Sequence, residues 1–374
     1  MSKLLAIDID LSPQLFDTLC ELVASRTAFC LLDQRLNTSL KQTQLAQLGA
    51  THVLSAEGEA RVDNGREVDE QIGVVMLTSG SSGSPKAAEL SWEALEASAR
   101  ITSTALAIDE PSIWVPILPP NHIGGLAVLL RAAFGFAGLR WTLDVARAPS
   151  QGATHIAVVQ AQAAQLDLSK YRHVLLGGAK PPKTLGTNVT ATWGMTETGS
   201  GIVYDGVPLP GVEVAHWEGE LLVRTPTLFT RYRDALRPTS LGPDGREDWF
   251  PTGDAGMVEQ GVVKVFGRIG SVITTGGEKV WPEQLEQVLR AHPFIHEVGV
   301  TSVPDSKWGQ AIVAVVRSSA PLNLEELSAL CEAKIGPWAK PKYLLAVPEL
   351  PKTANGKLQR ARLAEIAILE IVKR

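Results

Sequence analysis

Short apolar runs alternate with helix-like segments along most of the chain, and this alternation is the feature that most constrains the fold. The runs GVVMLT (73–78), HIAVV (155–159) and HVLLG (173–177) have the length of strands. The segment SWEALEASARITSTAL (91–106) has the length and composition of a helix. Strands that alternate with helices are typical of α/β domains, so we expect a large N-terminal α/β domain over residues 1–266.

The pattern changes near residue 248. A strand-turn-strand segment, AGMVEQGVVKVFGR (255–268), precedes a helix that opens at Pro282. Strands HEVGVTSV (296–303) and AIVAVV (311–316) and the helix NLEELSALCEAK (323–334) follow. This order predicts a small C-terminal α+β domain over 272–374. The glycines of GRIGS (267–271) permit a bend, so we expect the hinge between the domains there.

Composition limits the class of protein. The chain has 374 residues, 45% of them hydrophobic, which suits a globular protein with a core. A net charge of -5 without long charge runs argues against a nucleic-acid or acidic membrane surface and favours a small charged ligand. Cys20, Cys30 and Cys331 form no CxxC pair, which predicts reduced thiols rather than disulfides or a zinc site.

Neither a signal peptide nor a membrane span is expected. The start MSKLLAIDID has only a short apolar run, which predicts a cytoplasmic protein. Residues 123–139 are the most apolar stretch, but they contain four glycines and Arg131. A guanidinium is costly to bury without a partner, so Arg131 should reach either water or a fixed anion.

Two segments could bind a nucleotide. TSGSSGSPK (78–86) follows a predicted strand, and its backbone, hydroxyls and lysine suit phosphate oxygens; its spacing is not that of a Walker A loop, and a polar linker is the alternative. In WGMTET (193–198), Trp193 can stack on a purine and Glu197 can hold Mg²⁺. A core tryptophan with a helix-capping Thr-Glu pair is the alternative for the second segment.

Three further segments carry candidate groups. Asp254 in WFPTGD (249–254) offers two acceptors for ribose hydroxyls, or is a turn aspartate. The segment FGRIGSVITTGGEKVWP (266–282) combines an arginine with two flexible glycine sites. The segment PKTANGKLQR (351–360) places Lys357 on a turn, and a solvated surface lysine without a catalytic role is the alternative interpretation. In this order, from about Val74 to Arg360, the segments together resemble the adenylate-forming superfamily of acyl-CoA synthetases, adenylation domains and luciferases.

The resemblance implies a two-step reaction. A carboxylate attacks the α-phosphate of ATP to give an acyl-adenylate and pyrophosphate, and a thiol such as that of CoA then displaces AMP. Positioning and charge stabilisation would do most of the catalysis. By resemblance, Lys357 bridges the reacting carboxylate and phosphate, Thr196 contacts the α-phosphate, and Glu197 binds Mg²⁺.

The remaining roles also come from the resemblance. The β- and γ-phosphates would be bound by Thr78, Ser79, Gly80, Ser81, Ser82, Gly83 and Lys86. The adenosine would be bound by Gly177, Gly178, Ala179, Trp193, Gly194 and Met195, with Asp254 and Arg268 on the ribose. The small domain would rotate after adenylation to bring Gly276, Gly277 and Lys279 to the CoA side.

Two departures from the superfamily pattern stand out. Many relatives have Asp-Asp where this chain has Gly270-Ser271, so a carboxylate-dependent hinge contact is not expected there, although glycine still permits rotation. Only 77 residues precede the phosphate loop, fewer than in most relatives, so part of the usual N-terminal subdomain is expected to be missing or reduced.

The acid is suggested by a narrower resemblance. Three segments are most similar to the o-succinylbenzoate–CoA ligases of menaquinone biosynthesis: LPPNHIGGL (118–126), LLGGAKPP (175–182) and TGGEKVWP (275–282). In that group a His precedes the apolar helix, and an Arg later in the helix lies near the acyl pocket. His122 and Arg131 match these positions, so the resemblance implies that both bind the substrate. Gly178 and Thr198 would also contact the acid. A diacid would supply the anion that Arg131 needs.

Other interpretations stay open. Arg131 could pair with a structural carboxylate or reach solvent, and His122 could make a structural hydrogen bond. The alternative functions are another aryl- or medium-chain acyl-CoA ligase, an adenylation module that serves a carrier protein, and a non-catalytic nucleotide-binding relative. A homodimer is the oligomeric state to test first.

Overall fold

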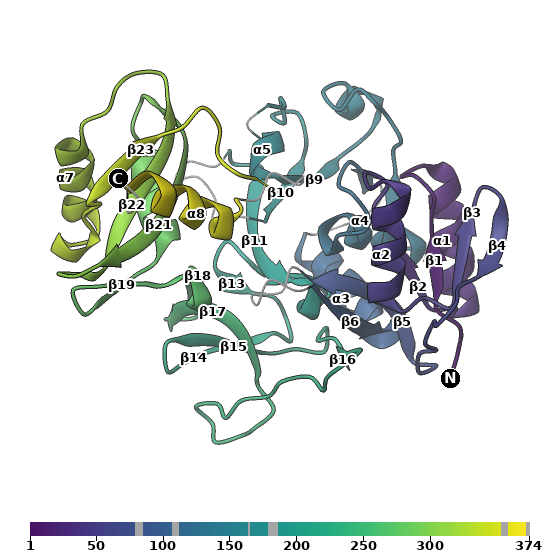
Figure 1. Ribbon diagram of the computed structural model, residues 1–374. Helices are drawn as coiled ribbons and strands as arrows, with labels where there is room; N and C mark the ends of the chain where they lie inside the picture. The colour runs from purple at the N-terminus through teal and green to yellow at the C-terminus, as the bar shows by residue number, and fades with distance from the viewer. Residues whose placement is uncertain (79–84, 107–111, 164, 179–185, 353–357, 372–374) are drawn as a thin grey trace. The chain divides into compact units, whose positions relative to one another are not determined.

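A computed structural model describes residues 1–78, 85–106, 112–163, 165–178, 186–352 and 358–371 (Figure 1). The chain divides into two compact units. Unit 1 consists of Met1–Ala215, Leu222–Pro251 and Val258–Val263, and unit 2 of His216–Leu221, Thr252–Met257 and Lys264–Arg374. A large α/β part and a smaller C-terminal part are therefore confirmed. The position of the hinge at residues 267–271 stays a prediction.

The first sheet of unit 1 has the strand order β16-β6-β5-β2-β1-β3-β4. Its central strands β5, β2, β1 and β3 are parallel, and the outer strands are antiparallel to their neighbours. The bounds are β1 (Leu5–Ile7), β2 (Phe29–Leu31), β3 (His52–Ser55), β4 (Gly58–Arg61), β5 (Ile72–Thr78), β6 (Lys86–Ser91) and β16 (Arg231–Tyr232).

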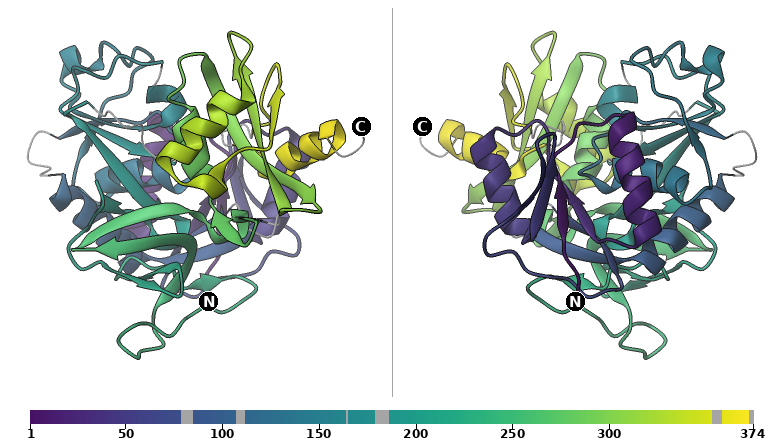
Figure 2. Two further views of the ribbon diagram at one scale, coloured as in Figure 1. Left: turned by 90° about the vertical axis from the view of Figure 1, so that its left-hand side faces the viewer. Right: turned by 90° about the vertical axis from the view of Figure 1, so that its right-hand side faces the viewer.

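Two capped helices cover the first sheet. Helix α1 (Pro13–Ser25) begins after Ser12, whose side chain accepts a hydrogen bond from Leu15 N. Helix α2 (Thr38–Leu48) begins after Asn37 and ends at Gly49, which adopts a φ of 64°. The two helices lie on opposite faces of the sheet (Figure 2, right). The N-terminal seventy residues thus supply four of the seven strands of this sheet, together with a helix on each face.

The second sheet of unit 1 has the order β13-β12-β11-β10-β9-β7-β8. Strands β8, β7, β9, β10 and β11 are parallel, and β12 and β13 are antiparallel. The bounds are β7 (Ile113–Val115), β8 (Gly138–Leu139), β9 (His155–Val159), β10 (His173–Gly177), β11 (Val189–Met195), β12 (Ser200–Tyr204) and β13 (Val207–Pro208).

Helices α3 (Trp92–Ala105) and α4 (Ile123–Ala133) lie between these two sheets. Helix α3 contacts β5 and β6 of the first sheet and β12 of the second, and α4 contacts β8, β9 and β12. Because α4 has neighbours on several sides, its apolar sequence is explained by burial within the protein. In the described parts of the chain, every helix is too short or too polar to cross a bilayer. Short helices η1 (Ala148–Gln151), α5 (Gln160–Ala163) and η2 (Thr196–Thr198) complete this region.

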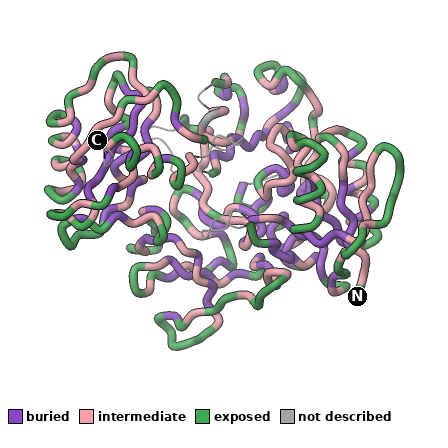
Figure 3. Tube along the Cα trace, viewed as in Figure 1, coloured by how far each residue is buried: buried purple, intermediate pink, exposed green. Residues whose placement is uncertain are grey.

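A four-stranded sheet has the order β14-β15-β17-β18. Its strands are β14 (Glu213–Trp217), β15 (Glu220–Arg224), β17 (Phe250–Glu259) and β18 (Val262–Arg268). Figure 3 shows buried residues along the central strands of the sheets and exposed residues in the connecting turns.

Unit 2 contains a five-stranded sheet with helices on both faces. Strand β22 carries the apolar run predicted at 311–316: Ile312, Ala314 and Val316 pack with α6 and α7, while residues 311, 313 and 315 pack with α8. The bounds are η3 (Ile269–Ser271), β19 (Ile273–Thr275), β20 (Glu278–Val280), α6 (Pro282–Leu289), β21 (Ile295–Asp305), β22 (Gly309–Ser318), α7 (Leu324–Lys334), η4 (Pro337–Ala339), β23 (Tyr343–Ala346) and α8 (Arg360–Ile371).

Candidate active site

The turn after β11 is shaped by a β-bulge. The register of β11 with β12 shifts between Trp193 and Gly194. A Cβ atom at Gly194 would lie 2.2 Å from the backbone oxygen of Ser200, so only glycine fits there. Strand β11 therefore ends with Trp193, Gly194 and Met195. The short helix η2 follows at the carboxyl end of this strand and begins with Thr196 and Glu197.

Thr198 closes this turn and is fully buried. Its Oγ1 accepts a hydrogen bond from Met195 N at 2.9 Å and lies 2.8 Å from the oxygen of Ser200. The side chain has 0% exposure and is engaged by the backbone, so it shapes the turn, and its predicted contact with the acid stays a prediction. The capping alternative for the WGMTET segment is thus correct for Thr198, whereas the Glu197 side chain has a different partner.

Glu197 is half-buried and bonds to a tyrosine that the sequence motifs did not indicate. The hydroxyl of Tyr232 donates a hydrogen bond to Glu197 Oε1 at 2.9 Å. The ring of the same tyrosine faces Lys86, whose Nζ lies 5.1 Å from the ring centroid. Tyr232 therefore links the phosphate-loop lysine to the candidate magnesium ligand within unit 1.

The phosphate-loop segment is described only at its ends. Thr78 ends β5 and is paired in register with Lys86, which begins β6. Thr78 is buried and Lys86 is exposed. The predicted residues between them, Ser79, Gly80, Ser81, Ser82 and Gly83, lie outside the described residues. The flanking strands β5 and β6 are antiparallel neighbours, and the predicted loop falls between them in the sequence.

The candidate adenine site lies at the ends of two neighbouring parallel strands. Gly177 ends β10, and Gly178 follows with a φ of +83°, a conformation that favours glycine. Trp193 is half-buried near the end of β11, which pairs with β10. Ligands commonly bind at the carboxyl ends of parallel strands. Ala179 lies outside the described residues.

Asp254 and Arg268 form a pair in unit 2. Asp254 lies in strand β17 with 7% exposure, so the alternative interpretation, a turn aspartate, is wrong. Arg268 Nε lies 3.1 Å from Asp254 Oδ1, and Arg268 Nη1 donates to the oxygen of Thr252 at 2.6 Å. The two residues predicted for the ribose are thus brought together.

His122 and Arg131 occupy different surroundings on helix α4. His122 is the N-cap residue, and its Nε2 lies 3.3 Å from Arg35 Nη2. Because arginine has no acceptor atom, Nε2 must accept this bond, which places the ring proton on Nδ1. Arg131 follows nine residues later, about 13 Å along the axis at the standard rise per residue. Arg35 is held in turn by Asp33 through contacts of 2.6 and 2.7 Å.

Arg131 is buried with 2% exposure and has no carboxylate partner among the described residues. Its Nε donates to Thr102 Oγ1 at 2.9 Å, and its guanidinium carbon lies 4.9 Å from the Trp114 ring centroid. Burial lowers the pKa of Arg131, and the buried Tyr204 hydroxyl opposes that effect. Within the described residues, the buried charge of Arg131 is therefore stabilised neither by a carboxylate nor by solvent.

Unit 2 carries the predicted CoA-side residues. Gly276 and Gly277 join β19 to β20, with φ values of +59° and +87°. Two positive φ values in a two-residue hairpin are typical of a type I′ turn. Lys279 follows on β20 and is exposed. Lys357 lies outside the described residues.

The described residues contain no group of three or more His, Cys, Asp or Glu side chains that could hold a metal ion. Magnesium is usually held by one or two carboxylates together with substrate phosphates. A single half-buried carboxylate, Glu197, which Tyr232 links to Lys86, therefore fits Mg²⁺ held in this way.

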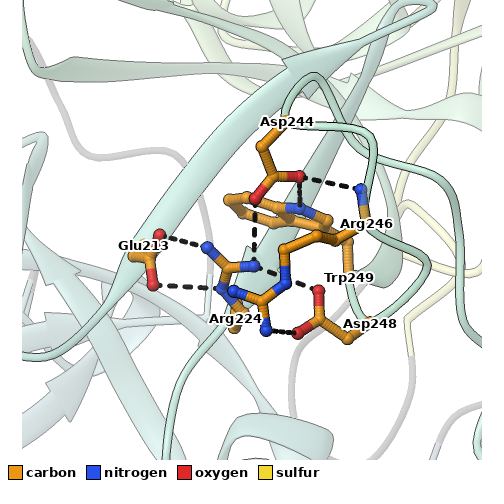
Figure 4. A network of polar contacts seen from close by, with 6 residues as sticks. All are labelled: Glu213, Arg224, Asp244, Arg246, Asp248 and Trp249. Atoms are coloured by element: carbon orange, nitrogen blue, oxygen red, sulfur yellow. Dashed lines mark hydrogen bonds and ion pairs between the residues drawn. The ribbon is translucent and has the colours of Figure 1, made fainter.

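A second concentration of charge, shown in Figure 4, is satisfied internally. Arg224 contacts Glu213, Asp244 and Asp248 at 2.6, 3.1 and 3.0 Å and stacks on Trp249 at 4.5 Å. Arg246 also pairs with Asp248, at 2.5 Å. Because these carboxylates are already engaged by arginines, the network is structural.

No sequence motif indicates Tyr232, Thr102 or Tyr204. Each acts through a contact that only the fold creates: Tyr232 is 35 residues from Glu197, and Thr102 is 29 residues from Arg131. Thr102 shares an apolar, helix-like segment with other small polar residues, and nothing in that pattern distinguishes it. The one available signal was the aromatic residue between two arginines at 231–233.

Comparison with known proteins identifies two family models along the chain. The model of AMP-binding enzymes matches residues 14–233, and the model of the AMP-binding enzyme C-terminal domain matches residues 284–357. The first match includes the region up to Tyr232, and the second ends at Lys357. The N-terminal residues that showed no motif from about residue 14 onward are therefore part of the family match.

Two relatives and one solved structure are similar over most of the chain. The probable 2-succinylbenzoate–CoA ligase of Mycobacterium tuberculosis (strain CDC 1551 / Oshkosh) is 34% identical over 332 residues, covering 80% of this chain and 85% of the relative. The 2-succinylbenzoate–CoA ligase of Bacillus cereus (strain ATCC 10987 / NRS 248) is 32% identical over 79% of this chain and 70% of its own length. The o-succinylbenzoate CoA synthetase of Bacillus subtilis, in complex with its acyl-adenylate intermediate, has a TM-score of 0.82 at 24% identity, covering 96% of this chain and 88% of that one.

Proposed function

This chain belongs to the family of AMP-binding enzymes, and from that premise we propose that it is an ATP-dependent o-succinylbenzoate–CoA ligase of menaquinone biosynthesis. In the first step a substrate carboxylate oxygen bonds to the α-phosphorus of ATP, and pyrophosphate leaves. In the second step the sulfur of CoA bonds to the acyl carbon, and AMP leaves. The relatives that are 32–34% identical support this activity.

The observation that carries the acid specificity is the buried guanidinium of Arg131. A desolvated cation is stabilised by a fixed anion, and a diacid brings a second carboxylate besides the one that reacts. Within the described residues, Arg131 contacts a hydroxyl and two aromatic side chains but no carboxylate. A monoacid would leave that charge uncompensated, so an aromatic diacid is favoured over a fatty acid.

The site residues have the following proposed roles. Lys86 and the loop 78–84 hold the β- and γ-phosphates, and Gly177, Gly178 and Trp193 hold the adenine. Asp254 and Arg268 hold the ribose, and Lys357 stabilises charge on the α-phosphate. Glu197 would hold Mg²⁺, which supplies charge neutralisation on the phosphates when it is bound. Gly276, Gly277 and Lys279 serve the CoA step, and His122 and Gly178 line the acyl site.

Location and assembly also belong to this proposal. Burial raises the pKa of the Cys30 and Cys331 thiols to about 12, so both are unreactive at neutral pH. We propose a cytoplasmic location, which is supported by the absence of a disulfide among Cys20, Cys30 and Cys331, all three of which the structure describes. Nucleic acid is not a proposed partner, and a homodimer can be tested by light scattering.

A substrate panel tests the proposed activity. Purified protein with ATP, Mg²⁺ and CoA should release pyrophosphate only when an acid is added, and o-succinylbenzoate should be preferred over benzoate and medium-chain fatty acids. Preference for a fatty acid would favour the alternative of a medium-chain ligase. Transfer to a carrier protein but not to CoA would favour an adenylation module, and absence of pyrophosphate release with every acid would favour a non-catalytic relative.

Substitution of Arg131 tests the specificity role. Arg131→Met keeps much of the side-chain volume and removes the charge, so kcat/KM for the diacid should fall at least about tenfold more than kcat/KM for benzoate. Arg147→Met is the control, because the Arg147 side chain is 80% exposed. Equal losses on the two acids would remove Arg131 from the specificity role.

A further inference from the structure

Tyr232 lies between two opposite charges of the proposed ATP site. Its ring faces the ammonium of Lys86 at 5.1 Å, and its hydroxyl donates to Glu197 Oε1 at 2.9 Å. The lysine contacts the ring face and the glutamate contacts the hydroxyl, so one side chain separates the two charges. The phenol thus satisfies each charge with a weaker, neutral partner.

We propose that Tyr232 is a positioning residue that keeps Lys86 and Glu197 apart, so that the lysine stays available to phosphate oxygens and the carboxylate to a divalent cation. This inference rests on the proposed function. A direct Lys86–Glu197 ion pair would neutralise the carboxylate that has to hold Mg²⁺. In the described part of the chain, no hydrogen bond or ion pair engages the second carboxylate oxygen, Oε2, which leaves it available to the ion.

The backbone that carries Tyr232 is fixed on both sides. Arg231 Nε and Arg233 Nη1 donate to the buried Glu89 at 2.8 and 3.0 Å, and Tyr232 itself pairs with Ala88 on β6. These bonds hold the short strand β16 against the strand that begins with Lys86. The tyrosine can therefore be replaced without releasing the strand.

A second set of contacts ties the tyrosine to the turn that carries Glu197. Phe229 N donates to the backbone oxygen of Glu197 at 2.8 Å, and the Phe229 and Tyr232 rings lie 4.8 Å apart. The side-chain bond from Tyr232 to Glu197 thus repeats a backbone bond between the same two segments. The backbone bond fixes the position of the turn that carries Glu197. The Tyr232 hydroxyl therefore orients the Glu197 carboxylate.

Two variants separate the ring from the hydroxyl. Tyr232→Phe keeps the ring over Lys86 and removes only the bond to Glu197, whereas Tyr232→Leu removes both. ATP binding without an acid substrate is measured by titration calorimetry over a series of Mg²⁺ concentrations, with AMP binding as the reference. AMP lacks the β- and γ-phosphates, so its affinity reports the folded nucleotide site without the lysine and the metal.

Tyr232→Leu should raise the Mg²⁺ concentration needed for half-maximal ATP affinity by about tenfold, the size of one lost hydrogen bond to a charged group, with a smaller increase for Tyr232→Phe. AMP affinity should stay within about twofold. In Lys86→Met/Tyr232→Leu the ion pair cannot form, so the Mg²⁺ requirement should fall back toward that of Tyr232→Phe. Tyr171→Phe, which removes a hydroxyl bonded to the oxygen of Val145, is the control and should not change the Mg²⁺ requirement.

The outcomes are distinguishable. An unchanged Mg²⁺ requirement in Tyr232→Leu, or a requirement that Lys86→Met does not relieve, overturns the positioning role. A parallel loss of AMP and ATP affinity shows that the tyrosine is merely structural and also overturns it. Absence of AMP binding by the unsubstituted protein would contradict the proposed function, and this inference with it.

Discussion

At the scale of single residues, removing one partner of the buried pair between Glu89 and Arg233 should strongly destabilise unit 1. Their side chains are 3% and 2% exposed and lie 3.0 Å apart. Burial lowers the pKa of Arg233, a sign that the guanidinium depends on its partner. Glu89→Gln leaves that charge uncompensated and should cost about 3–5 kcal/mol of unfolding free energy, measured by urea denaturation.

An exposed ion pair provides the matched control. Lys3 and Glu59 lie 2.7 Å apart, with side chains 41% and 39% exposed. Water screens such a pair, so Glu59→Gln should cost less than about 1 kcal/mol. If the two variants lost the same stability, burial of the Glu89–Arg233 pair would not be the cause.

Arg131 illustrates what the sequence could reveal about one residue. A lone arginine in an apolar run is visible in the sequence, and the physical chemistry of burial predicts that it needs a partner. The identity of its neighbours could not be predicted, because Thr102, Trp114 and Tyr204 come from three separate elements. Only the fold brings a hydroxyl, a ring face and a phenol around the same guanidinium.

At the scale of elements, the β19–β20 hairpin should separate the two proposed half-reactions. Gly277 has a φ of +87°, and no atom lies within 4 Å of a Cβ added there. Gly277→Ala should therefore strain the turn by about 1 kcal/mol without a clash. We expect a slower thioester step and unchanged pyrophosphate release, measured as two separate half-reactions. An equal effect on both would exclude a CoA-side role for this turn.

Helix α6 should give unit 2 a distinct pH dependence. Burial raises the pKa of Glu283, while Arg360 at 2.8 Å opposes the rise and the neighbouring Glu286 adds to it. An acid whose pKa is raised on folding contributes stability that is present below its ordinary pKa of 4.5 and is lost as the pH rises through the folded value. Glu283→Gln has no carboxyl group at this position and should not lose this stability. The melting temperature of the variant minus that of the unsubstituted protein should therefore increase as the pH rises above 4.5.

Glu297 supplies a control of opposite sign. Burial alone would raise its pKa, but Lys352 and Arg317 together lower it. Its stabilising contribution is therefore present above the ordinary value of 4.5 and is lost as the pH falls through the lowered pKa. Glu297→Gln should destabilise the protein near neutral pH, and the difference should shrink in acid. If the stability differences of Glu283→Gln and Glu297→Gln changed in the same direction with pH, the opposite pKa shifts of the two carboxyl groups would be contradicted.

Sequence patterns predicted the elements whose burial is continuous. The strands at 155–159 and 173–177 were predicted to the residue, because an apolar run between polar turns leaves little choice of bounds. Helix α2 was not predicted, since it buries only Leu48 and shows no apolar stripe. The two-residue strand β16 is too short for any pattern, which is why the motifs indicated Lys86 and Glu197 but not the tyrosine between them.

At the scale of the whole molecule, the proposed reaction draws on both units. The phosphate-loop and magnesium residues belong to unit 1, whereas Lys357 and the Gly276–Gly277 turn belong to unit 2. If each half-reaction uses a different face of unit 2, single substitutions in that unit should block one step and spare the other. Gly277→Ala tests the thioester step, and Lys357→Ala tests the adenylation step.

Lys357→Ala should lower acid-dependent pyrophosphate release by at least about a hundredfold, the usual effect of removing one group that stabilises transition-state charge. Thioester formation from supplied acyl-adenylate and CoA should stay within a few-fold, because the α-phosphate has already reacted. Lys334→Ala, an exposed position at the end of α7, is the control and should leave both steps intact. Loss of both steps together in Lys357→Ala would mean that one arrangement of unit 2 serves the whole reaction, and the division into two faces would be wrong.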